Sequence, residues 1–294
     1  MQIASRMKKL LSGPSSRKKP VASPRRSSDR PNESNEMSDH LQKDMSVFFP
    51  NSANFWRYPA LSYSAANKFP EQVLGILGAE LGVPAPREIS AEDFAGKSDG
   101  SELDQRFQHH GSDKAAHGYA PIYSHILEQM RELPNPCILE IGLGTNDPKA
   151  ISTMGQKGRP GASLRAFRDH MPIASIYGAD IDPKTMFSEE RIRTAVVDQL
   201  SPQSFAGMTR DLGAATFDLI IDDGLHSTEA NLNTLRFSFD ALRPRGWLVI
   251  EDVAPRTVEA WRLVTALVNT PRLHCTLVKA KSQFLFIAQR LAST

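Results

Sequence analysis

Five ionisable side chains follow two apolar runs of the chain, and their types suit acid–base or metal chemistry. The runs are Phe217–Ile221 and Trp247–Ile250, and the residues that follow them are Asp222, Asp223, His226, Glu251 and Asp252. Asp223 and Glu251 lie 28 positions apart. Clustered carboxylates repel one another unless a proton or a cation resolves the conflict. Oxygen ligands suit a hard ion such as magnesium, so the two groups predict a cation site if their strands are neighbours.

A second feature is the stretch Cys137–Gly144, which reads Cys-Ile-Leu-Glu-Ile-Gly-Leu-Gly. An apolar run that ends in Gly142 and Gly144 is typical of a buried strand whose exit turn lets the backbone approach a ligand. A dinucleotide fingerprint needs a third glycine three residues later, and that position is Asp147. The turn therefore favours a different ligand, or else an ordinary passage from strand to helix.

The elements that must position these residues alternate between strand and helix from Cys137 onward. Seven strands are expected, at Cys137–Leu143, Ser175–Ile181, Arg193–Val197, Phe217–Ile221, Trp247–Ile250, His274–Val278 and Gln283–Ala288. This order predicts an α/β fold with a Rossmann-like, seven-stranded, mostly parallel sheet and helices on both faces. Open sheets of this kind bind ligands at the carboxyl ends of their strands, where the acidic residues fall.

Two further polar pairs end the second and third expected strands. The second ends in Asp180-Ile181-Asp182, and a carboxylate there can accept hydrogen bonds from both ribose hydroxyls of a nucleoside cofactor. Asp198 and Gln199 follow the third. Taken singly, these residues could equally be caps of the strand ends.

Taken in order, the motifs resemble those of class I S-adenosylmethionine-dependent methyltransferases. They are Glu-x-Gly-x-Gly at Glu140–Gly144, Asp180, Asp198-Gln199, Asp-Asp-Gly-x-His at Asp222–His226 and Glu251-Asp252. The preceding segment Ser112-Asp113-Lys114, with His117 and Tyr119, resembles a subfamily of metal-dependent sugar O-methyltransferases and cephalosporin-hydroxylase-like proteins. The resemblance extends from about Gly111 to Arg290.

This resemblance implies roles for individual residues. The cofactor S-adenosylmethionine would be bound by Glu140, Gly142, Gly144, Ser163, Asp180, Asp182, Asp198, Gln199 and Asp222. Magnesium would be held by Asp223, Glu251 and Asp252, with Asp223 also counted as catalytic. His226 would be the catalytic base, since an unperturbed pKa near 6.5 leaves it able to take a proton at neutral pH. Leu225 stands where the subfamily commonly has serine, and Lys114 or His117 could face the pocket.

The implied function is Mg-dependent methylation of a sugar hydroxyl on a glycan or glycosylated metabolite. Catechol or phenol O-methylation is one alternative, and a non-catalytic S-adenosylmethionine-binding module is another. The module is disfavoured because base and metal ligands are all present. A formal net charge of +2 does not predict a nucleic-acid partner. A homo-oligomer remains open.

The remaining sequence predicts three regions. Residues 1–36 are rich in Ser, Pro, Lys and Arg, which predicts a disordered basic tail that could be a transit peptide, a membrane-surface contact, a nucleic-acid tail or a plain extension. Residues 37–110 are expected to form a helical cap, and residues 111–294 the methyltransferase domain. Residues 145–160 are an insertion expected to act as a lid. Two cysteines, a hydrophobic share of 40% and no apolar run of roughly 20 residues predict a soluble, cytoplasmic protein.

Overall fold

The computed structural model describes residues 59–292, with side chains described for residues 64–292. The predicted basic tail at residues 1–36 lies outside the described residues. The chain divides into two compact units, Met1–Tyr63 and Ser64–Thr294. The second unit contains the sheet and every site residue predicted from the sequence. The cap and domain boundaries predicted at residues 36 and 110 stay predictions.

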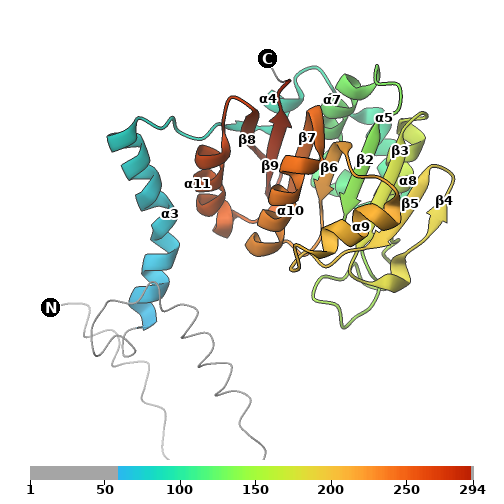
Figure 1. Cartoon of the computed structure of the whole chain (residues 1–294), viewed down its shortest axis with the longest axis horizontal. Coiled ribbons are helices and arrows are strands. Elements are labelled where there is room, and N and C mark those ends of the chain that lie inside the picture. Colours follow the sequence, from blue (N-terminus) through green and yellow to red (C-terminus); the bar gives the residue numbers. More distant parts are fainter. Residues whose placement is uncertain (1–58, 293–294) are drawn as a thin grey trace, which may run out of the picture. The chain divides into compact units, whose positions relative to one another are not determined.

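Within residues 59–292 the chain forms one mixed sheet of nine strands, in the order β1-β8-β9-β7-β6-β2-β3-β5-β4 (Figure 1). The strands are β1 (Glu88–Ser90), β2 (Cys137–Ile141), β3 (Ser175–Asp180), β4 (Ser188–Glu189), β5 (Ile192–Val196), β6 (Phe217–Asp222), β7 (Leu242–Val253), β8 (Leu273–Lys279) and β9 (Phe284–Arg290). The central strands β7, β6, β2, β3 and β5 run parallel, whereas β9 is antiparallel to both β7 and β8.

The expected count of seven strands is wrong, because two short strands extend the sheet. β1 pairs in parallel with β8, and β4 pairs antiparallel with β5. They hold three and two residues, too few to show the alternation that marks a strand in a sequence. β7 also begins earlier than expected, at Leu242, and passes through Arg243–Gly246 as strand. Arg245 adopts a φ of +67° there.

Helices cover both faces of the sheet, as the alternating pattern predicts (Figure 1). The helices of the described residues are α3 (Pro59–Leu81), α4 (Ala91–Ala95), α5 (Ser101–His110), α6 (Lys114–His117), α7 (Ala120–Met130), α8 (Ala162–His170), α9 (Ser204–Leu212), α10 (Thr228–Ala241) and α11 (Val258–Val268), with short 3-10 turns at Pro183–Thr185 and Pro255–Thr257. None of the helices within residues 59–292 combines the length and the apolar character that crossing a membrane would need.

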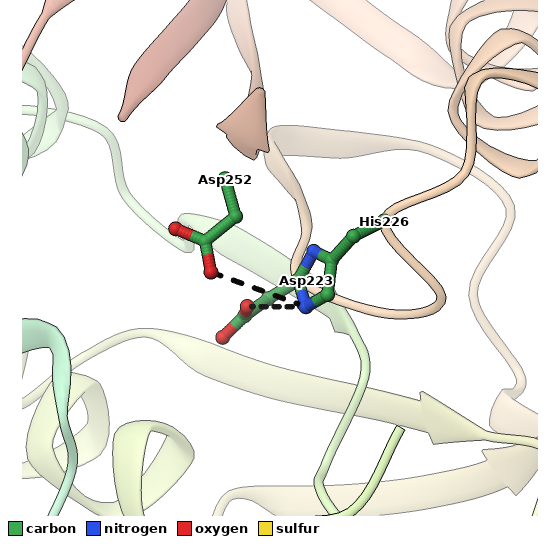
Figure 2. Close-up of side chains that lie close together, drawn as sticks. All are labelled: Asp223, His226 and Asp252. Atoms are coloured by element: carbon green, nitrogen blue, oxygen red, sulfur yellow. Dashed lines mark ion pairs between the residues drawn. The ribbon is translucent and has the colours of Figure 1, made fainter. Parts of the chain in front are cut away.

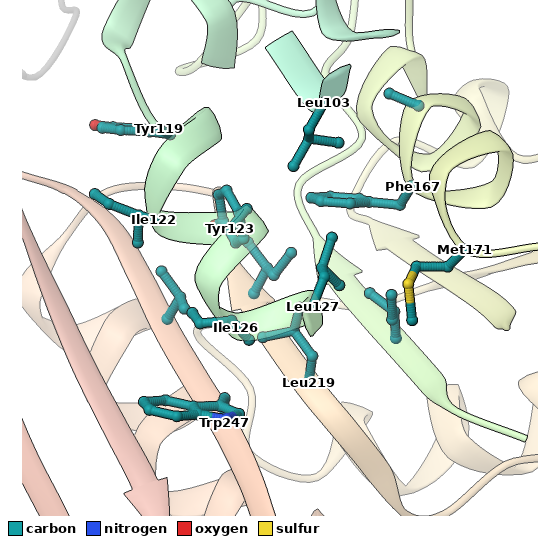
Figure 3. Close-up of a cluster of buried hydrophobic side chains, with 14 of the residues drawn as sticks. Leu103, Tyr119, Ile122, Tyr123, Ile126, Leu127, Phe167, Met171, Leu219 and Trp247 are labelled. Atoms are coloured by element: carbon teal, nitrogen blue, oxygen red, sulfur yellow. The ribbon is translucent and has the colours of Figure 1, made fainter. Parts of the chain in front are cut away.

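Each face of the sheet has its own hydrophobic core. On one face α5, α7 and α8 pack against Ile138 of β2 and Leu219 of β6 (Figure 3). On the other face α9, α10 and α11 pack against Leu139 and Ile141 of β2. All five residues of β2 are buried because successive side chains point to opposite, equally covered faces. Burial on both faces fixes the register of the central strands.

The register brings the predicted site residues to one edge. Asp222 pairs with Ile141 of β2 and with Ile250 of β7. The next residues along these strands, Gly142, Asp223 and Glu251, are therefore neighbours at the carboxyl end of the sheet. The glycine turn and both acidic groups meet there.

Candidate active site

Asp223, His226 and Asp252 form a compact cluster at this edge, with one donor atom from each lying within 4.8 Å of the others (Figure 2). His226 Nε2 lies 3.8 Å from Asp223 Oδ1 and 4.0 Å from Asp252 Oδ2. The three side chains are 22%, 28% and 20% exposed, respectively. Two carboxylates and an imidazole that remain open to solvent can bind a divalent cation or exchange a proton.

The backbone that carries two of these residues is strained. His226 and Asp252 both have a φ of +54°, a backbone conformation that residues other than glycine rarely adopt. Asp252 sits where the pairing of β7 with β9 shifts register between Ile250 and Val253. Such irregularities re-aim a side chain, and the strain costs about 1–3 kcal/mol per residue. In this conformation both side chains point toward Asp223.

A buried lysine lies directly behind the cluster. Lys114 is 1% exposed, and its Nζ lies 2.6 Å from Asp223 Oδ2, 2.7 Å from Glu251 Oε2 and 3.0 Å from Glu140 Oε1. Burial alone would lower the pKa of Lys114, but the carboxylates of Asp223, Glu140 and Glu251 outweigh it and hold that pKa well above its ordinary value. One ammonium group thus faces three carboxyl groups.

Glu251, predicted as a metal ligand, lies outside the Asp223–His226–Asp252 cluster. Its side chain is 2% exposed. Both of its oxygens accept hydrogen bonds from Lys114, and Oε1 also accepts one from the hydroxyl of Tyr123. Burial, followed by repulsion from Asp223, raises the pKa of Glu251 well above its ordinary value. The structure therefore shows Glu251 engaged by internal donors, where the sequence predicts contact with a metal.

Tyr119 and Tyr123, to which the sequence motifs give no chemical role, act on the two neighbouring acids. The Tyr119 hydroxyl donates to Asp252 Oδ1 at 2.5 Å, and His117 Nδ1 lies 3.7 Å from the same oxygen. Burial raises the pKa of Tyr119 far above its ordinary value, so the hydroxyl keeps its proton and remains a donor. The sequence signal for Tyr119 was its place in the segment that begins at Ser112, whereas Tyr123 had no signal of its own.

The glycine turn opens on a cavity of about 220 Å³. Seven of the predicted site residues line it: Gly142, Gly144, Asp180, Asp182, Asp198, Gln199 and Asp223. A second cavity of about 130 Å³ adjoins the first, because Gly142, Gly144 and Asp223 line both. Ser163 and His226 line the second cavity. The base candidate and the glycine turn therefore face adjacent cavities.

Glu140 and Asp222, predicted as cofactor-binding residues, line neither cavity. Both are fully buried. Glu140 accepts a hydrogen bond from Ser163 Oγ at 2.6 Å and pairs with Lys114. Asp222 accepts from Gln199 Nε2 at 2.8 Å and from Asn231 Nδ2 at 3.1 Å. Both carboxylates hold neighbouring elements together in this structure.

The acids after β3 differ in their availability. Asp180 accepts backbone hydrogen bonds on both oxygens, from Leu143 and Gly144 on Oδ2 and from Asp182 on Oδ1. It thereby fixes the glycine turn. Asp182 is more open and accepts from the Thr145 hydroxyl at 2.7 Å, which lowers the pKa of Asp182. Oδ2 of Asp180 thus accepts two hydrogen bonds already, whereas Oδ1 of Asp180 and both oxygens of Asp182 each retain a lone pair for a ligand hydroxyl.

Gly142 is required by the neighbouring strand exit. Its φ is +101°, and a Cβ placed on it would collide with the carbonyl oxygen of Asp223. Gly144 has a φ of +79°, and its Cβ would meet the side chain of Met154. From the sequence, the glycines of this turn predict the approach of a ligand. The structure shows that the backbone carrying Asp223 makes the close approach at Gly142.

The inserted segment at residues 145–160 folds back over the turn. Asn146 Nδ2 donates to the carbonyls of Gly155 at 2.6 Å and Gly158 at 3.0 Å, which closes the segment on itself. Ile151 lines the larger cavity although it is 91% exposed. The segment therefore forms one wall of that cavity, and its predicted action as a lid stays a prediction.

Comparison with known proteins finds relatives that match about half of the chain. No protein-family model matches it. It is 32% identical over 145 residues to 8-demethyl-8-alpha-L-rhamnosyl tetracenomycin-C 2'-O-methyltransferase from Streptomyces olivaceus, covering 49% of this chain and 35% of that protein. It is 33% identical over 139 residues to mycinamicin VI 2''-O-methyltransferase from Micromonospora griseorubida, covering 47% and 32%. The matches thus span about a third of the length of these curated relatives.

Among solved structures, the chain resembles the MycE methyltransferase from the mycinamycin biosynthetic pathway, determined in complex with Mg and SAH. The TM-score is 0.52 at 24% identity, covering 65% of this chain and 55% of MycE. The chain has the class I methyltransferase fold. β1 and β4 lie at the two edges of its sheet, and the relatives that match about half of its length are named O-methyltransferases.

Within the class I methyltransferase fold, the cavities occupy the edge where open α/β sheets bind ligands. The cluster of Asp223, His226 and Asp252 stands at the same edge, beside the smaller cavity. The carboxyl edge of the sheet therefore holds both the cavity of about 220 Å³ and groups able to move a proton.

Proposed function

We propose that this protein is an S-adenosylmethionine-dependent O-methyltransferase that uses a divalent cation, Mg²⁺ in the first instance, to methylate a hydroxyl of a sugar on a glycan or glycosylated metabolite. The observation that carries the proposal is the cluster of Asp223, His226 and Asp252 beside two adjacent cavities at the glycine turn. The O-methyltransferase relatives and the segment Ser112–Lys114 support placing it near the metal-dependent sugar O-methyltransferases.

The cofactor would occupy the larger cavity. Asp182 and Asp180 are placed there to accept from ribose hydroxyls, and Asp198 lies further along the same wall. Gly142 and Gly144 keep the turn free of side chains where both cavities meet. S-adenosylmethionine supplies an electrophilic methyl group, so the protein's task is to align the acceptor and remove its proton.

The residues fit a divalent cation. Asp223 Oδ1 and Asp252 Oδ2 both face His226, whereas the other oxygen of each carboxylate is engaged by Lys114 or Tyr119. These two free oxygens, on part-exposed side chains, would supply the negative charge that a cation balances. A cation held there supplies Lewis acidity that lowers the pKa of an acceptor hydroxyl. Glu251 is the predicted ligand that fits least, because Lys114 and Tyr123 engage it.

His226 would accept the hydroxyl proton. Its ring lines the smaller cavity, and its Nε2 lies 3.8 Å from Asp223 Oδ1 and 4.0 Å from Asp252 Oδ2, so both carboxylates would stabilise the imidazolium that forms. Asp223 would also share in binding the cation. The segment around Ile151 limits water on the cofactor side.

The test is calorimetric titration of the full chain with S-adenosylmethionine and S-adenosylhomocysteine, with and without Mg²⁺, followed by methyl transfer to acceptors. Rhamnosides, other glycosides and catechols form the acceptor panel, with His226→Ala as the control. Cofactor binding with methylation of a glycoside supports the proposal. Methylation of catechols alone shows the phenol alternative, and binding without turnover of any acceptor shows a binding module. Absence of cofactor binding would refute the proposal.

A further inference from the structure

Two tyrosines four residues apart each donate a hydrogen bond to one of two adjacent carboxylates. Tyr119 and Tyr123 project from the start of α7 (Figure 3), and each is at most 1% exposed. Tyr119 donates its hydroxyl to Asp252 Oδ1, and Tyr123 donates its hydroxyl to Glu251 Oε1. Because the residues are one helical turn apart, their hydroxyls reach consecutive positions of β7.

The outcome for the two carboxylates differs because of Lys114. Lys114 contacts both oxygens of Glu251, at 2.8 Å and 2.7 Å, so Glu251 has internal donors on both sides and is 2% exposed. Asp252 has Tyr119 on Oδ1, while Oδ2 faces His226 at 4.0 Å and the side chain is 20% exposed. One acid is enclosed, and its neighbour presents a single oxygen to the site.

We propose that Tyr119 is the positioning residue that selects Oδ2 of Asp252 as the oxygen offered to the cation. This inference rests on the cation of the proposed function. Asp252 follows a register shift in a strained backbone conformation, so its neighbours in β7 do not hold its side chain in a regular strand position. The Tyr119 hydroxyl supplies that restraint. Without it, Oδ1 is left to His117, whose Nδ1 lies 3.7 Å away.

The pair of tyrosines provides a matched experiment. Tyr119→Phe and Tyr123→Phe each delete one hydroxyl from a fully buried ring and leave the packing of the ring in place. Affinity is measured on the full chain with Mn²⁺ by electron paramagnetic resonance and with Mg²⁺ by calorimetry, both in the presence of S-adenosylhomocysteine. Tyr119→Phe should weaken cation binding by about 10- to 100-fold, the usual effect of losing a partner that orients a ligand. Tyr123→Phe should leave cation affinity unchanged.

A thermal melt of each variant shows whether a loss of cation affinity comes from loss of the fold. The two variants can be compared directly because each deletes one buried tyrosine hydroxyl. Turnover of Tyr119→Phe should recover at saturating cation, which loss of the fold would not permit. Equal cation affinity in Tyr119→Phe and the wild type would overturn the inference, as would an equal loss in both variants. A wild type that binds the cofactor product but no cation would overturn the cation assignment itself, and this inference with it.

Discussion

Replacement of Lys114 by methionine tests whether its ammonium group is what allows several acids to be buried together. The Nζ atom lies within 3.0 Å of an oxygen of Glu140, Asp223 and Glu251. Methionine fills much of the same space without charge. Glu140 and Glu251 would then remain buried with only the hydroxyls of Ser163 and Tyr123 as donors.

Removal of one partner from a buried ion pair costs about 3–5 kcal/mol, because the remaining charge is neither paired nor hydrated. We expect a loss of this size in the free energy of unfolding at pH 8. Burial raises the pKa of Glu251 and of Glu140, so the folded chain binds protons that the unfolded chain releases, and stability falls as pH rises. Deletion of the ammonium group raises both pKa values further. The difference between variant and wild type should therefore be larger at pH 8 than at pH 5.5.

Urea unfolding at the two pH values measures this difference, with Lys157→Met as the matched control because Lys157 is exposed. If Lys114→Met is too unstable to study, the double variant Lys114→Met with Glu251→Gln removes one buried charge and should regain part of the loss. A Lys114→Met variant within about 1 kcal/mol of wild type at pH 8 would refute the reasoning, since surface substitutions change stability by less than that.

Three further substitutions test other parts of the site and fold. Asp223→Asn should lower turnover by about 10²-fold or more while calorimetric affinity for S-adenosylhomocysteine is largely kept, and unchanged turnover would remove Asp223 from the chemistry. Gly142→Ala should lower the free energy of unfolding in urea by about 2–4 kcal/mol, since its Cβ would strike the carbonyl of Asp223. Gly155→Ala, with open space around it, should lower it by about 1–2 kcal/mol, and equal losses would contradict the contact. His170 is buried with no hydrogen bond to either ring nitrogen among the described residues, and burial lowers its pKa. Only the unfolded chain binds its proton near pH 6, so wild-type stability should fall below about pH 6.5 and His170→Gln should lessen that fall; an identical pH profile would argue against it.

The sheet could be predicted from the sequence where strands are long and buried on both faces. β2 and β6 are apolar runs that end in glycine or aspartate, and such runs leave little choice of register. The edge strands β1 and β4 escaped prediction because pairing with β8 and β5 makes them strands, and their own few residues do not. Arg243–Gly246 also resembles a loop, and β7 extends across it because Leu242 pairs with Phe217 of β6, with a shift of register before Trp247.

The site was predictable to the level of the strand end but not to the level of the atom. Residue type and spacing place Asp223, Glu251 and Asp252 at one edge, because carboxyl ends of parallel strands converge. Which of them is enclosed depends on Lys114 and Tyr123, whose contacts with Glu251 span 137 and 128 positions of the chain. Contacts over that distance leave no local pattern of hydrophobicity or propensity to read.

Main-chain hydrogen bonds hold the glycine turn and the residues that follow β6 in fixed positions relative to each other. The amide of Gly142 donates to the carbonyl of Ala179 at 2.7 Å, and the amide of Asp223 donates to the carbonyl of Ile141 at 2.8 Å. The ladder of hydrogen bonds thus continues one residue past the ends of β2 and β6, into the residues that line both cavities. Because Gly142 has no side chain, its Cα can lie against the Asp223 carbonyl, and the two strand exits form one rigid unit. The position of Asp223 relative to the larger cavity therefore depends on main-chain contacts.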